Sequence, residues 1–321
     1  MYTIGIDVGG TNLVAGVVDG DGKLLAKAKR PTAPDRGADA VLDDMAAVAE
    51  DAAVKAGVKK SDIAWVGIGC PGSHSKKTGM LLFANNIPFL NTPMVAAMQK
   101  TWDCPVYLEN DANAAALGEM LFGAAKGMKD FISITLGTGL GSGIVSNGEM
   151  VYGADGFAGE IGHTIVDPNG RECACGRLGC LETYCSATGL CRTVVELICN
   201  TAVPSDLRGV SYKELSAAKI YEAAIGGDAL ALSAFETCGE TLGRKLSDSV
   251  AHLSPEAIFI CGGMAAAGEL IMAPTRRALE KYVLPIYRGK VKILPSGLPE
   301  GNVAVLGASA LAWSVFDKAG K

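Results

Sequence analysis

Residues Tyr2–Leu25 read YTIGIDVGGTNLVAGVVDGDGKLL, and Phe131–Gly153 read FISITLGTGLGSGIVSNGEMVYG. In both segments an apolar stretch leads into a glycine-rich turn, a second apolar stretch and a further turn, which is the pattern of strands joined by hairpins. Two copies of one strand–loop–strand unit in a single chain indicate two related halves. The repeat therefore predicts a duplicated α/β fold.

The rest of the chain supports an α/β reading, since helical and strand-like stretches alternate. Helical spacing or composition predicts helices over 39–56, 93–102, 111–125 and 211–252, and near the C-terminus over 301–320. Short apolar runs predict strands at 63–72, 105–110 and 257–263. The 321 residues suggest two domains, because a domain commonly has about 100–200 residues.

Bulk composition limits the classes of function. Hydrophobic residues make up 49% of the chain and charged residues 20%, enough for a sizeable core. The formal net charge of -5 gives no general attraction to nucleic acid. We find no signal-peptide pattern and no apolar run of about 18 residues, so neither secretion nor a membrane span is expected. In the cytoplasm, the expected compartment, most of the ten cysteines should be reduced.

Three glycine-rich segments follow apolar runs and are candidates for nucleotide contact. In the first, DVGGTN, Gly9 and Gly10 let the backbone approach phosphate oxygens, and Asp7 could hold Mg²⁺ through water. In the second, LGTGLGSG, Thr138 adds a hydroxyl. In the third, CGGMAAAG, a glycine pair suits a flat adenine or its ribose. Each one taken alone also fits an ordinary turn, and neither of the first two has the ending of a P-loop.

The segment LENDANAAALGE places two polar residues, Asn110 and Asp111, where a strand meets a helix. Asp111 could accept the proton of a substrate hydroxyl during phosphoryl transfer. It could also simply cap the helix, or do both.

A cysteine cluster lies in GHTIVDPNGRECACGRLGCLE, residues 162–182. Cys173, Cys175 and Cys180 together with His163 make a Cys₃His set, a common composition of structural zinc sites. The alternative is a group of reduced thiols without a metal. The other cysteines are scattered and are interpreted as small core residues.

Together these motifs resemble the ROK family of repressors, open reading frames and sugar kinases, over nearly the whole chain. GIDVGGTN resembles its first phosphate motif, LGTGLGSG its second and FICGG its adenosine motif, while GEIGH with CACGRLGCLE resembles its sugar-and-zinc signature. The resemblance implies an actin-like sugar-kinase fold (ribonuclease H-like), with two domains around a cleft. We expect the first domain at residues 1–115, with a C-terminal helix over about 303–321 returning to it, and the second at 116–302.

The resemblance also implies an ATP-dependent hexose kinase that phosphorylates the 6-hydroxyl of glucose. Asp111 would be the general base, and His163 would use one ring nitrogen for zinc and the other for the sugar. The residues expected to bind the sugar are Asn86, Asn110, Asp111, Glu160, His163 and Glu182. Those expected to bind ATP and Mg²⁺ are Asp7, Gly9, Gly10, Thr11, Asn12, Thr138, Gly139, Gly262 and Gly263.

Other functions stay open at this point. The chain could be a kinase for N-acetylmannosamine, N-acetylglucosamine, fructose or allose, a polyphosphate-using kinase, or a sugar-sensing regulator without catalysis. The family resemblance favours a homodimer or higher oligomer. The first phosphate motif starts within the first ten residues, so we expect no preceding DNA-binding segment of the repressor kind. Leu90 stands where many members have Trp, and Ser142 where Gly is common.

Overall fold

The computed structural model describes residues 1–84, 87, 89–299 and 301–313. The chain divides into two compact units. Unit 1 contains residues 1–128 and 150–158 and the chain from residue 296 on, and unit 2 contains residues 129–149 and 159–295. The expected boundary after residue 115 falls inside a helix, Asp111–Phe122, and unit 1 instead runs on to residue 128.

Unit 1 is built on a five-stranded sheet in the order β3-β2-β1-β4-β8. Its strands are β1 (Tyr2–Val8), β2 (Asn12–Asp19), β3 (Leu24–Pro31), β4 (Ile63–Cys70) and β8 (Val106–Asn110). β1, β2 and β3 form the predicted antiparallel hairpins, while β4 and β8 are parallel to β1. The carboxyl ends of the three parallel strands therefore lie at one edge of the sheet, and Asp7 and Asn110 are both there.

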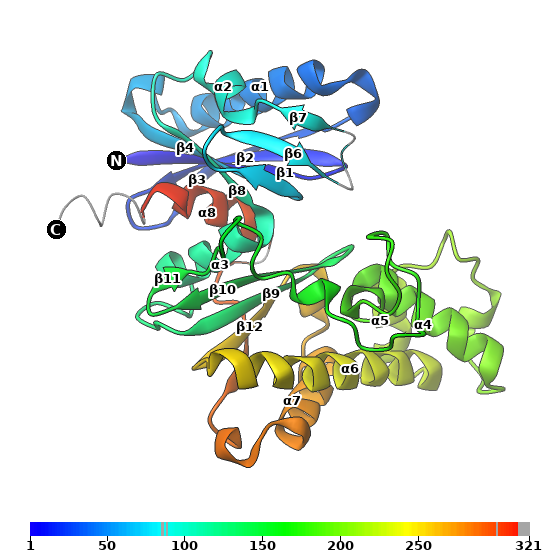
Figure 1. Ribbon diagram of the computed structural model, residues 1–321. Coiled ribbons are helices and arrows are strands. Elements are labelled where there is room, and N and C mark those ends of the chain that lie inside the picture. Colours follow the sequence, from blue (N-terminus) through cyan, green and yellow to red (C-terminus); the bar gives the residue numbers. More distant parts are fainter. Residues whose placement is uncertain (85–86, 88, 300, 314–321) are drawn as a thin grey trace. The chain divides into compact units, whose positions relative to one another are not determined.

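Helices cover both faces of this sheet (Figure 1). The helices of unit 1 are α1 (Ala38–Ala56), α2 (Met94–Gln99), α3 (Asp111–Phe122) and α8 (Val303–Ser309). Ile4 and Ile6 on β1 are fully buried in the core beneath α1. On the other face α8 lies directly on the strands. The contact is so close that a Cβ at Gly5 would lie 1.9 Å from the Val305 carbonyl oxygen, so only glycine fits there. Strand β8 leads directly into helix α3, and Asp111 is the first residue of that helix.

Unit 2 repeats the arrangement, with a sheet in the order β11-β10-β9-β12-β13. Its strands are β9 (Phe131–Leu136), β10 (Leu140–Ser146), β11 (Glu149–Met150), β12 (Ala257–Cys261) and β13 (Lys292–Pro295). β9 and β10 are antiparallel, and β12 and β13 are parallel to β9. The predicted duplication of the fold is thus confirmed, since each sheet combines an antiparallel hairpin with two parallel strands.

The helices of unit 2 are α4 (Ala187–Asn200), α5 (Ala217–Ile225), α6 (Ala229–Leu253) and α7 (Glu269–Tyr282). α6 and α7 pack side by side (Figure 1). Their close approach depends on Gly243, where a Cβ would meet the Thr275 carbonyl oxygen at 2.2 Å. Short 3-10 turns cover Ile161–His163, Leu181–Thr183 and Gly263–Ala267. In the part of the chain described above, no helix is both long and apolar enough to cross a membrane.

Unit 1 also carries a small antiparallel sheet that the sequence did not predict. Its strands are β5 (Ser73–Ser75), β6 (Met80–Phe83) and β7 (Leu90–Thr92). His74 on β5 is largely buried, and its Nε2 has no hydrogen-bond partner among the described residues. Burial lowers the pKa of His74 to about 4, and the charge of Glu109 opposes part of that change.

This histidine predicts a pH dependence of stability. The pKa of His74 is about 4 in the folded protein and 6.5 ordinarily, so between these values the unfolded chain binds the proton more tightly. Above pH 6.5 His74 is neutral in both states and does not weaken the fold. As the pH falls from 6.5 toward 4, the unfolded chain takes up the proton first, and the free energy of unfolding decreases. Between pH 7 and pH 5, wild type should lose ~1–2 kcal/mol more unfolding free energy than His74→Gln. Urea denaturation at both pH values measures this, and equal losses would contradict it.

Candidate active site

The residues singled out from the sequence are divided between the two units. Unit 1 holds Asp7, the loop of residues 9–12, Asn110 and Asp111, and unit 2 holds the second and third glycine segments and the cysteine cluster. Asn86 lies outside the described residues.

The start of helix α3 shows which residue caps it. The N-cap is Asn110, whose side-chain oxygen accepts from the N–H groups of Ala112 at 2.9 Å and Asn113 at 3.3 Å. Asp111 is the first residue inside the helix, and its carboxylate accepts from the Ala112 N–H at 3.0 Å. The capping role that could have explained Asp111 is thus filled by its neighbour.

Asp7 and Asp111 form an acidic pair in unit 1. Burial, together with the negative charge of Asp111, raises the pKa of Asp7 to about 7. Two nearby carboxylates that resist joint ionisation are stabilised by a divalent cation placed against them. The donor set therefore fits Mg²⁺, which accepts carboxylate oxygens and keeps several waters.

The first glycine loop connects β1 to β2. The Gly9 N–H is used within the loop, where it donates to the Asn12 carbonyl at 3.0 Å. Thr32 holds the loop from the side, with its hydroxyl donating to the Gly9 carbonyl at 2.6 Å. Among the described residues, the N–H groups of Gly10 and Thr11 form no hydrogen bond. These two amides, rather than that of Gly9, can meet an anionic ligand.

The second glycine loop, between β9 and β10, is held by the segment that follows the cysteine cluster. Glu182 accepts from the Leu140 N–H at 3.1 Å. The Ala187 N–H donates to the Gly137 carbonyl at 2.8 Å, and the Thr188 hydroxyl donates to the Thr138 carbonyl at 2.9 Å. These three bonds join the cysteine segment to a candidate phosphate loop.

Two glycines next to this loop lie close to neighbouring atoms. A Cβ at Gly139 would meet a Glu182 carboxylate oxygen at 2.3 Å. Gly262 has φ +89°, and a Cβ there would meet the Leu136 carbonyl oxygen at 2.5 Å. Gly262 is thus a packing glycine, whereas Gly263 faces open space that a ligand can occupy.

Ser142 connects the second loop to the GEIGH segment. Its hydroxyl donates to the Gly159 carbonyl and accepts from the Ile161 N–H at 3.2 Å. Both of those residues flank Glu160. A serine in place of the more common glycine therefore holds the backbone on either side of a predicted sugar-binding residue.

The cysteine cluster has metal-binding geometry. The ligand atoms of His163, Cys173, Cys175 and Cys180 all lie within 4.8 Å of one another. The Cys175 and Cys180 sulfurs are 3.6 Å apart, and the Cys173 sulfur is 3.7 Å from His163 Nδ1. Tetrahedral zinc, with Zn–S bonds of about 2.3 Å, separates two sulfur ligands by ~3.8 Å. The four side chains thus fit a zinc ion.

The charge state of the cluster also suits a cation. Burial acts to raise the pKa of Cys175, but hydrogen bonds with Arg177 and the neighbouring cysteines outweigh it and lower the pKa to about 6. Cys175 is therefore a thiolate at neutral pH, and the thiolate is the form that binds metals. Arg177 also donates to the His163 carbonyl at 2.9 Å.

The cluster orients two predicted sugar-binding side chains. Nδ1 of His163 faces Cys173, so the other ring nitrogen, Nε2, points away and lies 4.0 Å from a Glu160 carboxylate oxygen. Glu182 Oε1 lies 3.6 Å from the Cys173 sulfur, while Oε2 accepts from the Leu140 N–H. His163 and Glu182 are thus both fixed from the side of the cysteines.

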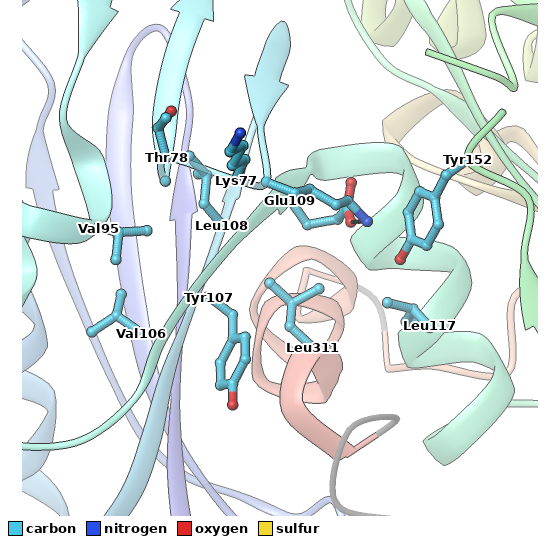
Figure 2. A pocket seen from close by; sticks show the side chains of 12 residues that line it. Lys77, Thr78, Val95, Val106, Tyr107, Leu108, Glu109, Leu117, Tyr152 and Leu311 are labelled. Atoms are coloured by element: carbon cyan, nitrogen blue, oxygen red, sulfur yellow. Dashed lines mark ion pairs between the residues drawn. The ribbon is translucent and has the colours of Figure 1, made fainter. Parts of the chain in front are cut away.

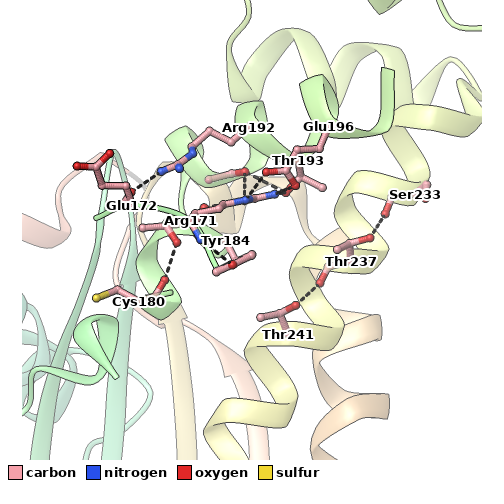
Figure 3. Close-up of polar contacts among 12 residues, drawn as sticks. Arg171, Glu172, Cys180, Tyr184, Arg192, Thr193, Glu196, Ser233, Thr237 and Thr241 are labelled. Carbon is pink, nitrogen blue, oxygen red and sulfur yellow. Dashed lines mark hydrogen bonds and ion pairs between the residues drawn. The ribbon is translucent and has the colours of Figure 1, made fainter. Parts of the chain in front are cut away.

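A buried arginine anchors the cysteine segment to α4 (Figure 3). Arg171 is 8% exposed and donates to the carbonyls of Thr183 and Gly189 and to the Thr193 hydroxyl. It also makes a bidentate pair with Glu196, at 2.8 and 2.6 Å. We did not predict this residue, because its partners come from separate segments and only the fold reveals that it is buried.

Comparisons with known proteins place the chain in a family. The family model described as ROK matches residues 3–315. The chain is 35% identical to a glucokinase of Thermotoga maritima over 96% of both chains, and 37% identical to one of Halalkalibacterium halodurans over 88% of this chain and 87% of that one. It also resembles a solved ROK family glucokinase from Streptomyces griseus in complex with glucose and AMPPNP, at 36% identity and a TM-score of 0.85, covering 98% of this chain and all of that one. This chain belongs to the ROK family.

Proposed function

We propose that this protein is an ATP-dependent hexose kinase that transfers the γ-phosphoryl group of ATP to the 6-hydroxyl of glucose. The observation that carries the proposal is its likeness, over 98% of the chain, to a glucokinase solved with glucose and AMPPNP. AMPPNP is an analogue of ATP, so that structure pairs the sugar acceptor with the donor nucleotide. The two glucokinase relatives of similar length support the same activity.

Asp111 is the proposed general base. As the 6-oxygen forms its bond to the γ-phosphorus, the bond from phosphorus to the bridging oxygen of ADP breaks and the hydroxyl proton passes to the Asp111 carboxylate. The first turn of α3 suits this role, since Asn110 caps the helix and Asp111 lies directly after it. A positioned base of this kind typically contributes about 10²–10⁴ in rate.

The proposed sugar-binding groups are carboxylates, amides and an imidazole. Carboxylates, amides and an imidazole can pair with hydroxyls that both donate and accept hydrogen bonds. In unit 2 these groups are held by the cysteine cluster and by Ser142, which limits their freedom before the sugar binds. The proposed set is Asn86, Asn110, Asp111, Glu160, His163 and Glu182.

We assign ATP to the glycine loops and Mg²⁺ to the acidic pair. Gly10, Thr11 and Thr138 would contact phosphates, and Gly263 would face the adenosine. Asp7 would hold Mg²⁺ through water, beside Asp111. When bound with ATP, Mg²⁺ offsets the negative charge of the phosphates.

A zinc ion is proposed for the Cys₃His cluster, with a structural role. Four protein ligands close a tetrahedral site, as in structural rather than catalytic zinc sites. Within this chain its effect is to fix the His163 ring and the Glu182 carboxylate. Loss of the ion would release both groups and, through Glu182, one hydrogen bond of the second glycine loop.

The preferred sugar is tested with a panel of acceptors. Among hexoses and 2-acetamido hexoses at matched ATP and Mg²⁺, we expect glucose to have the highest kcat/KM. A free 2-hydroxyl can pair with the Glu160 carboxylate and the His163 ring, whereas an N-acetyl group needs more volume and offers a different pattern of donors and acceptors. Sites that bind polar groups reject mismatched analogues strongly, because their own groups stay unpaired. A higher kcat/KM for N-acetylmannosamine or N-acetylglucosamine would reassign the substrate.

A further inference from the structure

Glu109 is a buried carboxylate to which the proposed mechanism gives no role. It lies on β8, directly before Asn110, and is 6% exposed. Its Oε1 accepts from the Asn110 N–H at 3.0 Å and from the Asn113 side-chain amide at 3.1 Å. These two donors lie on either side of Asp111 in the chain. One carboxylate oxygen therefore holds the turn that carries the proposed base.

The second oxygen of Glu109 is held from elsewhere in unit 1. The Lys76 ammonium lies 2.8 Å from Oε2 and also sits over the Tyr152 ring, 2.8 Å from its centroid. Burial raises the pKa of Tyr152, and the interaction with the charged Glu109 carboxylate raises that pKa further. Tyr152 thus stays neutral, and the cation that compensates the Glu109 carboxylate is Lys76.

These groups lie in the wall of a cavity of about 550 Å³ in unit 1 (Figure 2). Figure 2 shows Tyr152 next to Glu109, with Leu117 and Leu311 nearby. The Glu109 side chain is only 8% exposed, whereas the Lys76 side chain is 45% exposed, so water screens the pair in part while the carboxylate stays buried. Lys77 lines the same cavity but forms no ion pair among the described residues.

We propose that Glu109, neutralised by Lys76, is a positioning residue for phosphoryl transfer. It fixes the Asn110–Asn113 turn so that the Asp111 carboxylate meets the attacking hydroxyl. The inference rests on the proposed kinase activity and gives Glu109 no contact with substrate. Precise placement matters because a displacement of about 1 Å can cost ~10²-fold in rate. Removing only Lys76 leaves a buried, unpaired carboxylate beside the turn, which is strongly unfavourable.

The test is a double-mutant cycle of Glu109→Gln and Lys76→Met, with Lys77→Met as the matched control. Sugar-dependent ADP release gives kcat and KM, and calorimetric titration gives the Kd for glucose. We expect each single variant to lose about tenfold or more in kcat, with KM and Kd for glucose changed by less than about threefold. The double variant, which removes both charges, should lose less than the product of the two single losses. The control should retain wild-type kcat.

The outcomes separate this inference from the proposed function. A wild-type protein without sugar-dependent turnover overturns both. Wild-type turnover together with an unchanged kcat in Glu109→Gln overturns the positioning role alone. A fall in kcat with an equal loss of glucose binding would also overturn the positioning role. The same holds if the loss in the double variant equals the product of the two single losses. If Glu109→Gln does not fold, Lys76→Met decides, because the Lys76 side chain is 45% exposed, so its exchange disturbs packing less while it still removes the counter-charge of Glu109.

Discussion

Replacing Asp111 with Asn should lower kcat for glucose by at least ~10²-fold, while glucose binding stays within a few-fold of wild type. Asn can still hydrogen-bond the 6-hydroxyl but cannot take its proton. The helix start should remain intact, since the cap is Asn110 and the exchanged group accepts from the Ala112 N–H, a bond that Asn can also accept. Coupled ADP-release kinetics and calorimetric glucose titration measure the two effects separately.

Asn113→Ala is a useful comparison for this variant. Its side-chain amide donates to Glu109 in the same helix turn, so it perturbs the turn but leaves the proposed base in place. We expect its kcat to exceed that of Asp111→Asn by at least ~tenfold, because only the latter removes proton transfer. An Asp111→Asn enzyme with more than about a tenth of wild-type kcat would refute the general-base assignment.

The second large effect concerns the cysteine cluster. Cys175→Ala should lower the zinc content from about one ion per chain to well below that, and kcat/KM for glucose should fall ~10–100-fold with it. The physical reason is that the cluster fixes His163 through Nδ1 and Glu182 through the Cys173 sulfur. Mass spectrometry of the metal and the coupled kinase assay should change together.

Cys199→Ala is the matched control, because Cys199 is also exposed but lies outside the cluster. It should retain the zinc and the activity of wild type. Two results would reject the zinc proposal: a wild-type protein that is fully active with almost no zinc, or a Cys175→Ala variant that keeps its zinc.

The duplicated fold could be predicted because its signal is local and repeated. Each copy has an apolar run, a glycine turn and a second run, and these become β1–β2 and β9–β10. The helix beginning at Asp111 was also predicted, since its alanine-rich sequence follows a clear strand and a capping residue. The small sheet of β5, β6 and β7 was not, because strands of three or four residues are too short for periodicity to appear.

Helix α4 shows a signal that was available and not used. Ser186 caps it by accepting from the Gly189 N–H, and buried Leu190 and Val194 follow at helical spacing. A capping serine followed by apolar residues four positions apart predicts a helix. The helical stretches expected between 211 and 252 are confirmed as α5 and α6, and Asp228 caps the second of these helices.

Within the candidate site, sequence could name residue types but not their long-range partners. The spacing of the cysteines predicted a metal set, and the structure brings its four ligands together. The contacts of Glu182 with the second glycine loop and of Glu109 with Lys76 join segments 42 and 33 positions apart, respectively. Such pairs depend on the tertiary fold, and a buried Glu or Arg looks in sequence like any exposed charge.

Phosphorus NMR of a mixture of protein, Mg²⁺, ATP and glucose labelled with ¹³C at position 6 tests the kinase assignment most directly. One ADP and one phosphomonoester should form per ATP consumed, with phosphorus coupled to the labelled carbon. No ATP should be consumed when glucose is omitted. ATP that stays intact with glucose present, phosphate released as the free ion, or a phosphomonoester on a carbon other than C6 would contradict the assignment.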